Sequence, residues 1–337
     1  MTKRADQISR FLASAGWQSA TMSPITGDAS ARVYQRLFHP KTQQTAILMD
    51  ASPDRAGSSA PFLAVAEYLK QAGLSAPVVF AHDIATGFLL LEDLGDDLFA
   101  NVITNDPSQE RPLYEAAVHV ICHLHDHPNP ELPPLGPAQM AQATDLAFLH
   151  YRKTPRAQLS ADAAEAMDVL RDMLARLDDF NKVSLRDYHA ENLIWLPQRS
   201  GIARVGLLDF QDAVLTHPAY DLMSLIRDAR RDVSPAIADH LITMFCQING
   251  HDETRFRAEA ALISAQRNLR ILGIFARLSR VMGKPQYVDL IPRVWANLQT
   301  DLSHPSLSRL SAALGPLLPP PTEDFLHHLR TPCQTPS

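Results

Sequence analysis

The stretch Ser184-Leu185-Arg186-Asp187-Tyr188-His189-Ala190-Glu191-Asn192-Leu193 decides how this chain is interpreted. It sets an Asp and an Asn five positions apart, directly ahead of the apolar run 193–196. A second short apolar run follows at 205–208 and ends in Asp209-Phe210-Gln211-Asp212. The residues between the runs include Pro197 and Gly201, which favour a turn. We therefore expect a hairpin that brings Asp209 back beside Asn192.

The order of these polar residues is typical of phosphoryl transfer. That chemistry needs one Asp to orient and deprotonate an acceptor hydroxyl, together with an Asn and a second Asp that bind Mg²⁺. Taken singly, Asp187 or Asp209 is a turn or cap residue at the end of an apolar run. Their combination with Asn192 at this spacing predicts instead that Asp187 is catalytic and that Asn192 and Asp209 share one hard cation.

The segment resembles the aminoglycoside phosphotransferase-like kinases, the small-molecule branch of the protein-kinase-like fold. Further stretches are similar to the anomeric kinases of cell-wall amino sugars, which act on N-acetylmuramate or N-acetylglucosamine. They are Gly27-Asp28-Ala29-Ser30, residues 89–96, Asp209–Ala213, residues 220–225 and residues 268–273. The resemblance implies an α+β bilobal fold, with a small antiparallel-sheet N-lobe and a larger, mostly helical C-lobe. It also implies ATP and Mg²⁺ as cofactors.

Composition limits the other classes. The 337 residues suffice for two lobes with cores of their own, and 46% hydrophobic with 20% charged residues is usual for a globular protein. The net charge of −6 argues against a nucleic-acid partner. The three cysteines form no CxxC motif, which suggests reduced thiols in the cytoplasm. Neither a signal peptide nor a membrane span is expected, and the sequence leaves the oligomeric state open.

The N-lobe is predicted over residues 1–95, with a helix at 4–15 and strands near 22–26, 32–38, 45–50, 77–82 and 87–92. By the resemblance, Gly27, Asp28, Ala29 and Ser30 would cover the nucleotide phosphates, although one Gly by itself indicates only a hairpin turn. The strand Thr45–Asp50 lacks the Lys that kinases carry there, and Met49 stands near its place. Either Arg32 or Arg36 supplies the positive charge, and we favour Arg32 because it follows the turn directly; otherwise nucleotide binding is weak or absent.

A missing strand Lys leaves Glu67, on the helix expected at 61–72, without its usual partner. Residues 92–95 are predicted to link the lobes, and the resemblance implies that the backbone of Glu92 and Leu94 contacts adenine. Asp221, at an expected helix start, caps that helix or accepts hydrogen bonds from the catalytic loop, and the second role is the one that the resemblance suggests.

The C-lobe is predicted over residues 96–315, with helices at 112–126, 138–151, 160–179, 234–248 and 255–283. Asp212 is a candidate acceptor contact. The last helix carries Arg267, Arg270, Arg277 and Arg280 loosely on one side. This is a solvated face, or part of it binds an acidic substituent of the substrate, with Arg270 as the candidate. Residues 316–337 are interpreted as a Pro-rich tail with few apolar anchors.

The sequence therefore predicts an ATP-dependent kinase of a small polar molecule, with an amino sugar as the favoured acceptor. An aminoglycoside, choline, homoserine or a fructosamine remains open as the acceptor. A pseudokinase that binds nucleotide without turnover is also open, because the strand Lys is missing. A metal-dependent hydrolase using Asp187, His189 and Asp209 would leave the hairpin and the linking segment unexplained.

Overall fold

The computed structural model describes residues 3–25, 31–152 and 161–331. The chain forms two compact units. The first comprises Met1–Val120 and Ala190–Asp212, and the second comprises Ile121–His189 and Ala213–Ser337. The chain therefore passes from the second unit to the first between Asp187 and Asn192.

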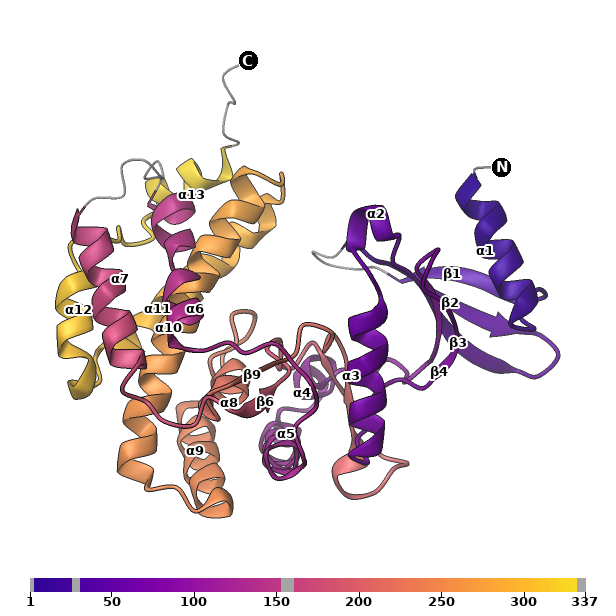
Figure 1. Ribbon diagram of the computed structural model, residues 1–337, viewed down its shortest axis with the longest axis horizontal. Coiled ribbons are helices and arrows are strands. Elements are labelled where there is room, and N and C mark those ends of the chain that lie inside the picture. The colour runs from indigo at the N-terminus through magenta and orange to yellow at the C-terminus, as the bar shows by residue number, and fades with distance from the viewer. Residues whose placement is uncertain (1–2, 26–30, 153–160, 332–337) are drawn as a thin grey trace. The chain divides into compact units, whose positions relative to one another are not determined.

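The first unit is built on a five-stranded antiparallel sheet of order β1-β2-β3-β5-β4 (Figure 1). Its strands are β1 (Thr21–Ile25), β2 (Val33–His39), β3 (Gln44–Asp50), β4 (Val79–Asp83) and β5 (Phe88–Glu92). Its helices are α1 (Lys3–Ser14), α2 (Pro53–Ala56), α3 (Ala60–Gln71) and α4 (Phe99–Asn105). The five strands, α1 and α3 agree with those predicted over this part of the chain, with boundaries shifted by one or two residues, whereas no range was predicted for α2 or α4.

Alternation along the strands gives the sheet two distinct faces. Phe11 and Leu12 of α1 pack against one face, in a core of side chains from β2, β3 and β5: Leu37, Ala46, Leu48, Phe88 and Leu90. The opposite face carries Tyr34 and Met49, which lie across from each other in the β2–β3 register. Figure 1 shows α1 and α3 on opposite sides of the sheet.

A short hairpin completes the first unit. Strand β7 (Leu193–Trp195) pairs antiparallel with β8 (Val205–Leu207), which confirms the hairpin expected from the sequence. The loop after α3 holds it, because Leu207 N–H donates to the Ser75 carbonyl at 2.9 Å. The backbone packs closely at Gly206, where an added Cβ would lie 3.1 Å from Leu94 Cδ1 and 3.2 Å from Ile194 Cβ.

The second unit is mainly helical (Figure 1). Its helices are α6 (Pro137–Gln142), α7 (Ala161–Leu174), α8 (Ala219–Ile226), α9 (Pro235–Asn249), α10 (Glu253–Arg280), α11 (Ile291–Leu302), α12 (Ser308–Leu314) and α13 (Glu323–Arg330), and α5 (Glu110–Asp126) begins in the first unit. One strand pair, β6 (Lys182–Ser184) with β9 (Val214–Thr216), lies among them. Helix α10 packs against α8, α11 and the π-helical turn Ala147–Tyr151.

Two expectations for this unit are wrong. The helix expected at 138–151 is interrupted, since α6 ends at Gln142 and a separate π-helical turn begins at Ala147. The segment 316–337 is not only a tail, because α13 buries Leu326 and Leu329. These leucines are three apart on one side of a helix, a spacing that the surrounding prolines obscured.

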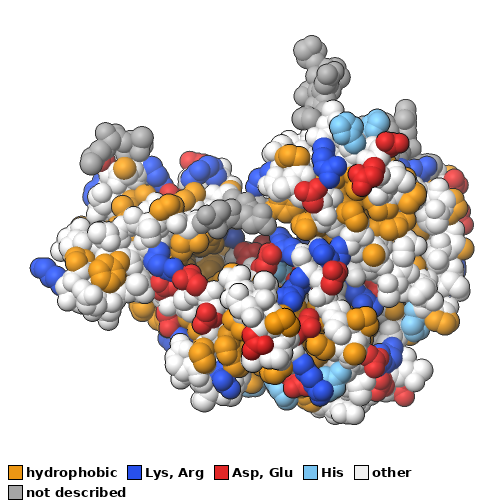
Figure 2. Space-filling model, turned by 180° about the vertical axis from the view of Figure 1, so that it is seen from behind, with side chains coloured by type: hydrophobic (Ala, Val, Ile, Leu, Met, Phe, Trp, Pro, Cys, Tyr) orange, Lys and Arg blue, Asp and Glu red, His pale blue; other side chains and the backbone are white. Residues whose placement is uncertain are grey.

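No helix among residues 3–25, 31–152 and 161–331 has the length and apolar character needed to cross a membrane. In the face shown in Figure 2, acidic and basic side chains are intermingled.

Candidate active site

The β7–β8 hairpin brings together the two residues predicted to bind a cation. Leu208 N–H donates to the carbonyl oxygen of Asn192 at 2.9 Å, so Asp209 directly follows the residue bonded to Asn192. Asp209 has φ of +55°, a conformation that is costly for a residue with a side chain. Its carboxylate is 43% exposed and accepts a hydrogen bond from Gln211 Nε2 at 2.9 Å. An amide oxygen and an accessible carboxylate are a ligand set that suits Mg²⁺, which keeps water and phosphate as its other ligands.

The side chain after Asp209 fixes the hairpin against α3. Phe210 is fully buried, and its ring lies 4.9 Å from the ring of Phe62. This packing holds the polypeptide on both sides of the strained Asp209, so that its carboxylate stays at the surface of the unit.

Arg32 and Arg36 have different partners. Arg32 Nη1 lies 3.7 Å from Asp209 Oδ1, at the end of the hairpin. Arg36 Nε lies 2.8 Å from Asp93, and its Nη2 donates to Asp96 at 2.7 Å. Arg36 is therefore committed to the segment after β5, whereas Arg32 supplies positive charge beside Asp209.

The strand position near which kinases carry Lys is apolar in this chain. Met49 is completely buried, and Tyr34 lies opposite it in the sheet. Burial raises the pKa of the Tyr34 hydroxyl, and the charge of Arg32 and a hydrogen bond from it offset part of this effect. Glu67 is exposed on α3 and bonds to Gln71 at 3.0 Å. Its carboxylate therefore has a partner on its own helix and none on β3.

The segment after β5 is tied to the same hairpin. Arg199, in the turn between β7 and β8, donates to Glu92 Oε1 at 2.5 Å. Trp195 N–H donates to the Asp97 carbonyl at 2.8 Å, and the side chain of Leu94 approaches Gly206. The segment Glu92–Asp97 and the β7–β8 hairpin thus belong to one packed structure within the first unit.

Asp187 lies in the second unit, in a loop that is held by α8. The buried Asp221 carboxylate accepts hydrogen bonds from Ser184 Oγ at 2.6 Å, Leu185 N–H at 2.7 Å and Arg186 N–H at 3.0 Å. Of the two roles considered for Asp221, the second is therefore confirmed: it supports the loop. Burial raises the pKa of Asp221 to about 6, against the lowering effects of these three donors and of Arg267.

Arg186, the residue before Asp187, has φ of +69°. Strained residues persist only where the surroundings fix them, and they are concentrated at functional sites. Among the described residues four non-glycine residues have positive φ, and two of them are Arg186 and Asp209. The strain thus lies beside or at two of the three residues that the sequence predicts to carry the chemistry.

The arginine face predicted for α10 is not uniformly solvated. Arg267 is only 6% exposed and donates through Nη2 to Ser224 Oγ at 2.6 Å, so the expectation of a solvated face is wrong for it. Arg270 is half-buried, and Asp212 is exposed in the first unit. Gly27, Asp28, Ala29 and Ser30 lie outside the described residues.

Three supporting residues were missed from the sequence. Gln211 bonds to Asp209, Ser224 donates to the Arg186 carbonyl in the loop before Asp187, and Arg267 donates to Ser224. Gln211 lies within Asp209-Phe210-Gln211-Asp212 and could have been identified from its place there. Ser224 and Arg267 carried none that distinguishes them from ordinary helix residues.

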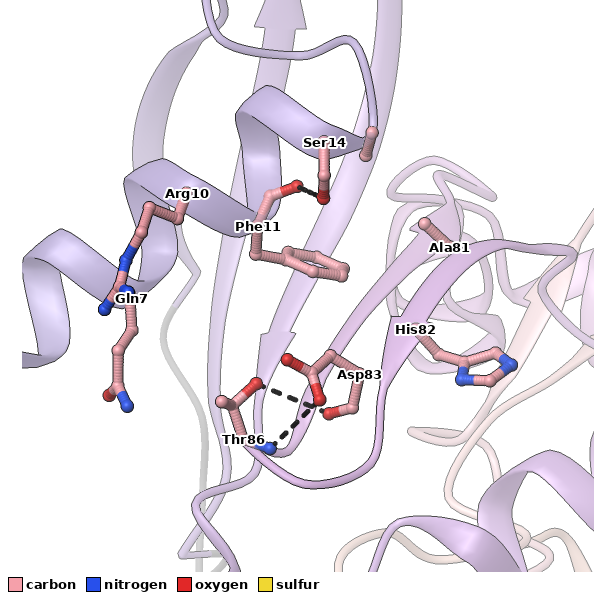
Figure 3. Close-up of a pocket in the computed structure, with 9 residues that line it drawn as sticks. Gln7, Arg10, Phe11, Ser14, Ala81, His82, Asp83 and Thr86 are labelled. Atoms are coloured by element: carbon pink, nitrogen blue, oxygen red, sulfur yellow. Dashed lines mark hydrogen bonds between the residues drawn. The ribbon is translucent and has the colours of Figure 1, made fainter.

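One cavity of about 390 Å³ lies in the first unit, between α1 and the β4–β5 turn (Figure 3). It is lined by Gln7, Arg10, Phe11, Ser14, Ala15, Ala81, His82, Asp83 and Thr86. Asp83 accepts from Thr86 N–H at 3.2 Å, and Ser14 Oγ donates to the Phe11 carbonyl at 2.8 Å. None of the predicted site residues that the structure describes lines this cavity.

A family model described as the phosphotransferase enzyme family matches residues 21–257. An N-acetylmuramate/N-acetylglucosamine kinase of Caulobacter vibrioides is 38% identical, over 90% of this chain and 93% of its own. The protein of that name from Pseudomonas putida is 26% identical, over 93% of this chain and 94% of its own.

Solved structures share the fold. A choline/ethanolamine kinase family protein from Mesorhizobium loti has a TM-score of 0.63 at 17% identity, covering 92% of this chain and 98% of its own. An aminoglycoside phosphotransferase from Streptomyces rimosus, in complex with ADP and streptomycin, has a TM-score of 0.50 at 17% identity, covering 75% and 93%. The predicted α+β, protein-kinase-like fold is confirmed.

Proposed function

Because this chain belongs to the phosphotransferase enzyme family, we propose that it transfers the γ-phosphoryl group of ATP to the anomeric hydroxyl of N-acetylmuramate or N-acetylglucosamine. The name of the Caulobacter vibrioides relative supports the choice of acceptor. The structural observation that carries the proposal is the pairing of Asn192 with the strand end that leads to Asp209, with Arg32 beside it.

In this proposal Asn192 and Asp209 hold Mg²⁺. When bound, the ion neutralises charge on the phosphates and aligns them for transfer. Arg32 adds a second positive charge at the same place, which is the work of the missing strand Lys. Gly27, Asp28, Ala29 and Ser30 are proposed to cover the phosphates with backbone N–H groups.

Asp187 is proposed to orient the acceptor hydroxyl and to accept its proton. An anomeric hydroxyl is more acidic than a simple alcohol, so an ordinary carboxylate suffices as the base. The support from Asp221 matters because phosphoryl transfer depends on alignment, and a loop held by three hydrogen bonds keeps Asp187 at a fixed place in its unit.

The adenine contacts are proposed to come from the segment after β5. The N–H of Glu92 already donates to the Val78 carbonyl at 2.8 Å. The proposed contacts therefore use the carbonyl of Glu92 and the backbone of Leu94. The ties of this segment to Arg36 and Arg199 would keep it in place as nucleotide binds.

The acceptor contacts are proposed to involve Asp212 and Arg270. N-acetylmuramate differs from N-acetylglucosamine by a lactyl group, which carries a carboxylate. Arg270 is half-buried, and its guanidinium forms no hydrogen bond or ion pair with the part of the chain that the structure describes. A half-buried arginine of this kind suits a carboxylate. The proposed enzyme works in the cytoplasm, in the recycling of cell-wall amino sugars, where ATP is supplied.

The test is phosphate transfer from labelled ATP to a panel of acceptors that begins with the two amino sugars and includes choline, homoserine, a fructosamine and an aminoglycoside. We expect turnover of an amino sugar and a loss of about 10³-fold or more in Asp187→Asn. ATP binding without turnover of any acceptor would indicate a pseudokinase, and turnover of another acceptor alone would replace the proposed substrate.

A second measurement addresses Arg270. Arg270→Ala should raise KM for N-acetylmuramate about tenfold and leave KM for N-acetylglucosamine within about twofold, because only the former carries the carboxylate. Arg277→Ala, an exposed arginine of the same helix, is the matched control. Equal effects on the two sugars would remove Arg270 from the proposed acceptor site.

A further inference from the structure

Arg267 is a buried charge in the middle of α10. Its side chain is only 6% exposed, its Nη2 donates to Ser224 Oγ at 2.6 Å, and its guanidinium lies 5.0 Å from the centre of the Tyr220 ring. Its Nε and Nη1 are buried without a hydrogen-bond partner among the described residues. Its charge acts on the buried Asp221 carboxylate. Burying an arginine that makes only one hydrogen bond is nevertheless costly for stability.

Ser224 connects this arginine to the loop that carries Asp187. The serine is 2% exposed on α8, and its hydroxyl donates to the carbonyl oxygen of Arg186 at 3.0 Å. Asp221, one turn earlier on α8, accepts the N–H of the same Arg186. Both backbone polar groups of the strained residue before Asp187 are therefore fixed by one helix.

The hydroxyl proton of a helical serine ordinarily has more than one acceptor, because it can also turn to the carbonyl four residues earlier. The guanidinium of Arg267 is only a donor, and at 2.6 Å it occupies a lone pair of Ser224 Oγ. The hydroxyl proton is consequently directed away from Arg267, toward the carbonyl of Arg186. The positive charge also polarises the hydroxyl and strengthens the bond that it donates.

We propose that Arg267 is a positioning residue for Asp187 and acts through Ser224, by holding the Arg186 carbonyl and thereby the orientation of the Asp187 backbone. The inference rests on the proposed role of Asp187 as the base. All of its contacts lie within the second unit. It gives α10 a part in the reaction, although Arg267 touches no reacting atom.

The chain offers a matched pair of serines for the test. The control is Ser279, which lies on α10 and is 1% exposed. Its hydroxyl donates to the Leu329 carbonyl of α13 at 2.8 Å and does not contact the loop. Ser224→Ala should lower kcat about 10- to 100-fold and leave the Kd of ATP within about twofold. Ser279→Ala should lower Tm by a comparable amount and change kcat by less than about twofold.

A double-mutant cycle tests the link to Arg267. Arg267→Met should lower kcat to a similar degree, and Ser224→Ala with Arg267→Met should be no slower than the slower single variant, since both changes remove the same bond. If the fold-loss in kcat of the double variant equals the product of the two single fold-losses, Arg267 acts by another route. If Arg267→Met does not fold, the comparison of Ser224→Ala with Ser279→Ala still tests whether the bond from Ser224 to the loop matters for kcat.

The positioning role of Arg267 and the proposed function can be overturned separately. Equal kcat values in Ser224→Ala and Ser279→Ala, with an inactive Asp187→Asn, would overturn the positioning role alone. Wild-type turnover in Asp187→Asn would instead overturn the proposed function.

Discussion

The guanidinium group of Arg32 lies 3.7 Å from the carboxylate of Asp209, and Met49 is buried on β3 near the place where kinases carry Lys. A positive charge is thus present at the proposed phosphate site, but it comes from the residue that precedes β2. The kinase requirement is for a cation at a point in space, and the strand that supplies it is of secondary importance.

Arg32→Ala should therefore raise KM for ATP about 10- to 100-fold, because the charge that is proposed to contact the phosphates is lost. Arg32→Lys should recover part of the loss. Arg10→Ala, which removes an exposed arginine of α1, serves as the control for net charge. Unchanged nucleotide affinity and turnover in Arg32→Ala would show that another group does the work of the missing Lys.

The buried carboxylate of Asp221 leads us to expect that kcat falls at acidic pH. Its pKa is raised to about 6 by burial, and only the ionised carboxylate can accept all three hydrogen bonds from Ser184, Leu185 and Arg186. The groups that face it are these donors, Arg267 of α10 and the hydroxyl of Tyr188. We expect kcat to fall as the pH drops below about 6, since protonation releases part of the loop.

The check is the pH profile of Asp221→Asn. This variant should have a lower kcat, by about tenfold or more, and its profile should lack the limb near pH 6. A limb that persists unchanged in the folded variant would assign it to another group.

Asp301 predicts a pH dependence of stability. Its side chain is only 2% exposed. The carboxylate accepts hydrogen bonds from Ser264 Oγ at 2.6 Å and Asn268 Nδ2 at 2.9 Å, and Arg227 Nε lies 3.3 Å from it. Burial raises its pKa to about 6, from 3.8. The folded state thus binds a proton more tightly than the unfolded state, and this contribution to stability is present below pH 3.8 and is lost as the pH rises to about 6.

The free energy of unfolding of the wild type, relative to that of Asp301→Asn, should therefore decrease between pH 4 and pH 7, by an amount on the order of 3 kcal/mol. Denaturant unfolding at both pH values measures it, and the difference between the two proteins removes the contributions of other groups. A constant difference would mean that Asp301 is ionised throughout this range.

The close packing around Gly273 predicts that no larger residue fits at this position. A Cβ at this position would lie 2.2 Å from the backbone carbonyl carbon of Leu146 and 2.5 Å from the amide nitrogen of Ala147, so the backbone would have to move. Gly273→Ala should destabilise the protein by more than about 2 kcal/mol. Gly136→Ala, whose Cβ would meet only the end of the Gln139 side chain at 3.3 Å, should cost less than about 1 kcal/mol. Denaturant midpoints compare the two.

Much of the site was predictable because its residues are close in sequence or joined by a simple hairpin. Strand β7, the turn and strand β8 are local, and their alternation places Asp209 beside Asn192 whatever the rest of the chain does. The positions of the strands in the first unit followed from turns and periodicity in the same way, whereas their order in the sheet came from the structure. The elements that were mispredicted depend on tertiary packing: α6 packs against α7, and the π-helical turn and α13 pack against α10.

The sequence by itself determined the candidate catalytic motif, because this depends on spacings of a few residues, and the fold, because several of its stretches resemble those of one kinase family. Only the tertiary structure decided which arginine does what: Arg32 approaches Asp209, Arg36 binds Asp93 and Asp96, and Arg267 is buried against Ser224. An arginine side chain is long, and its charge can serve any acid or hydroxyl within its reach. Its role is therefore set by the elements that fold around it, and this information is absent from its neighbours in the chain.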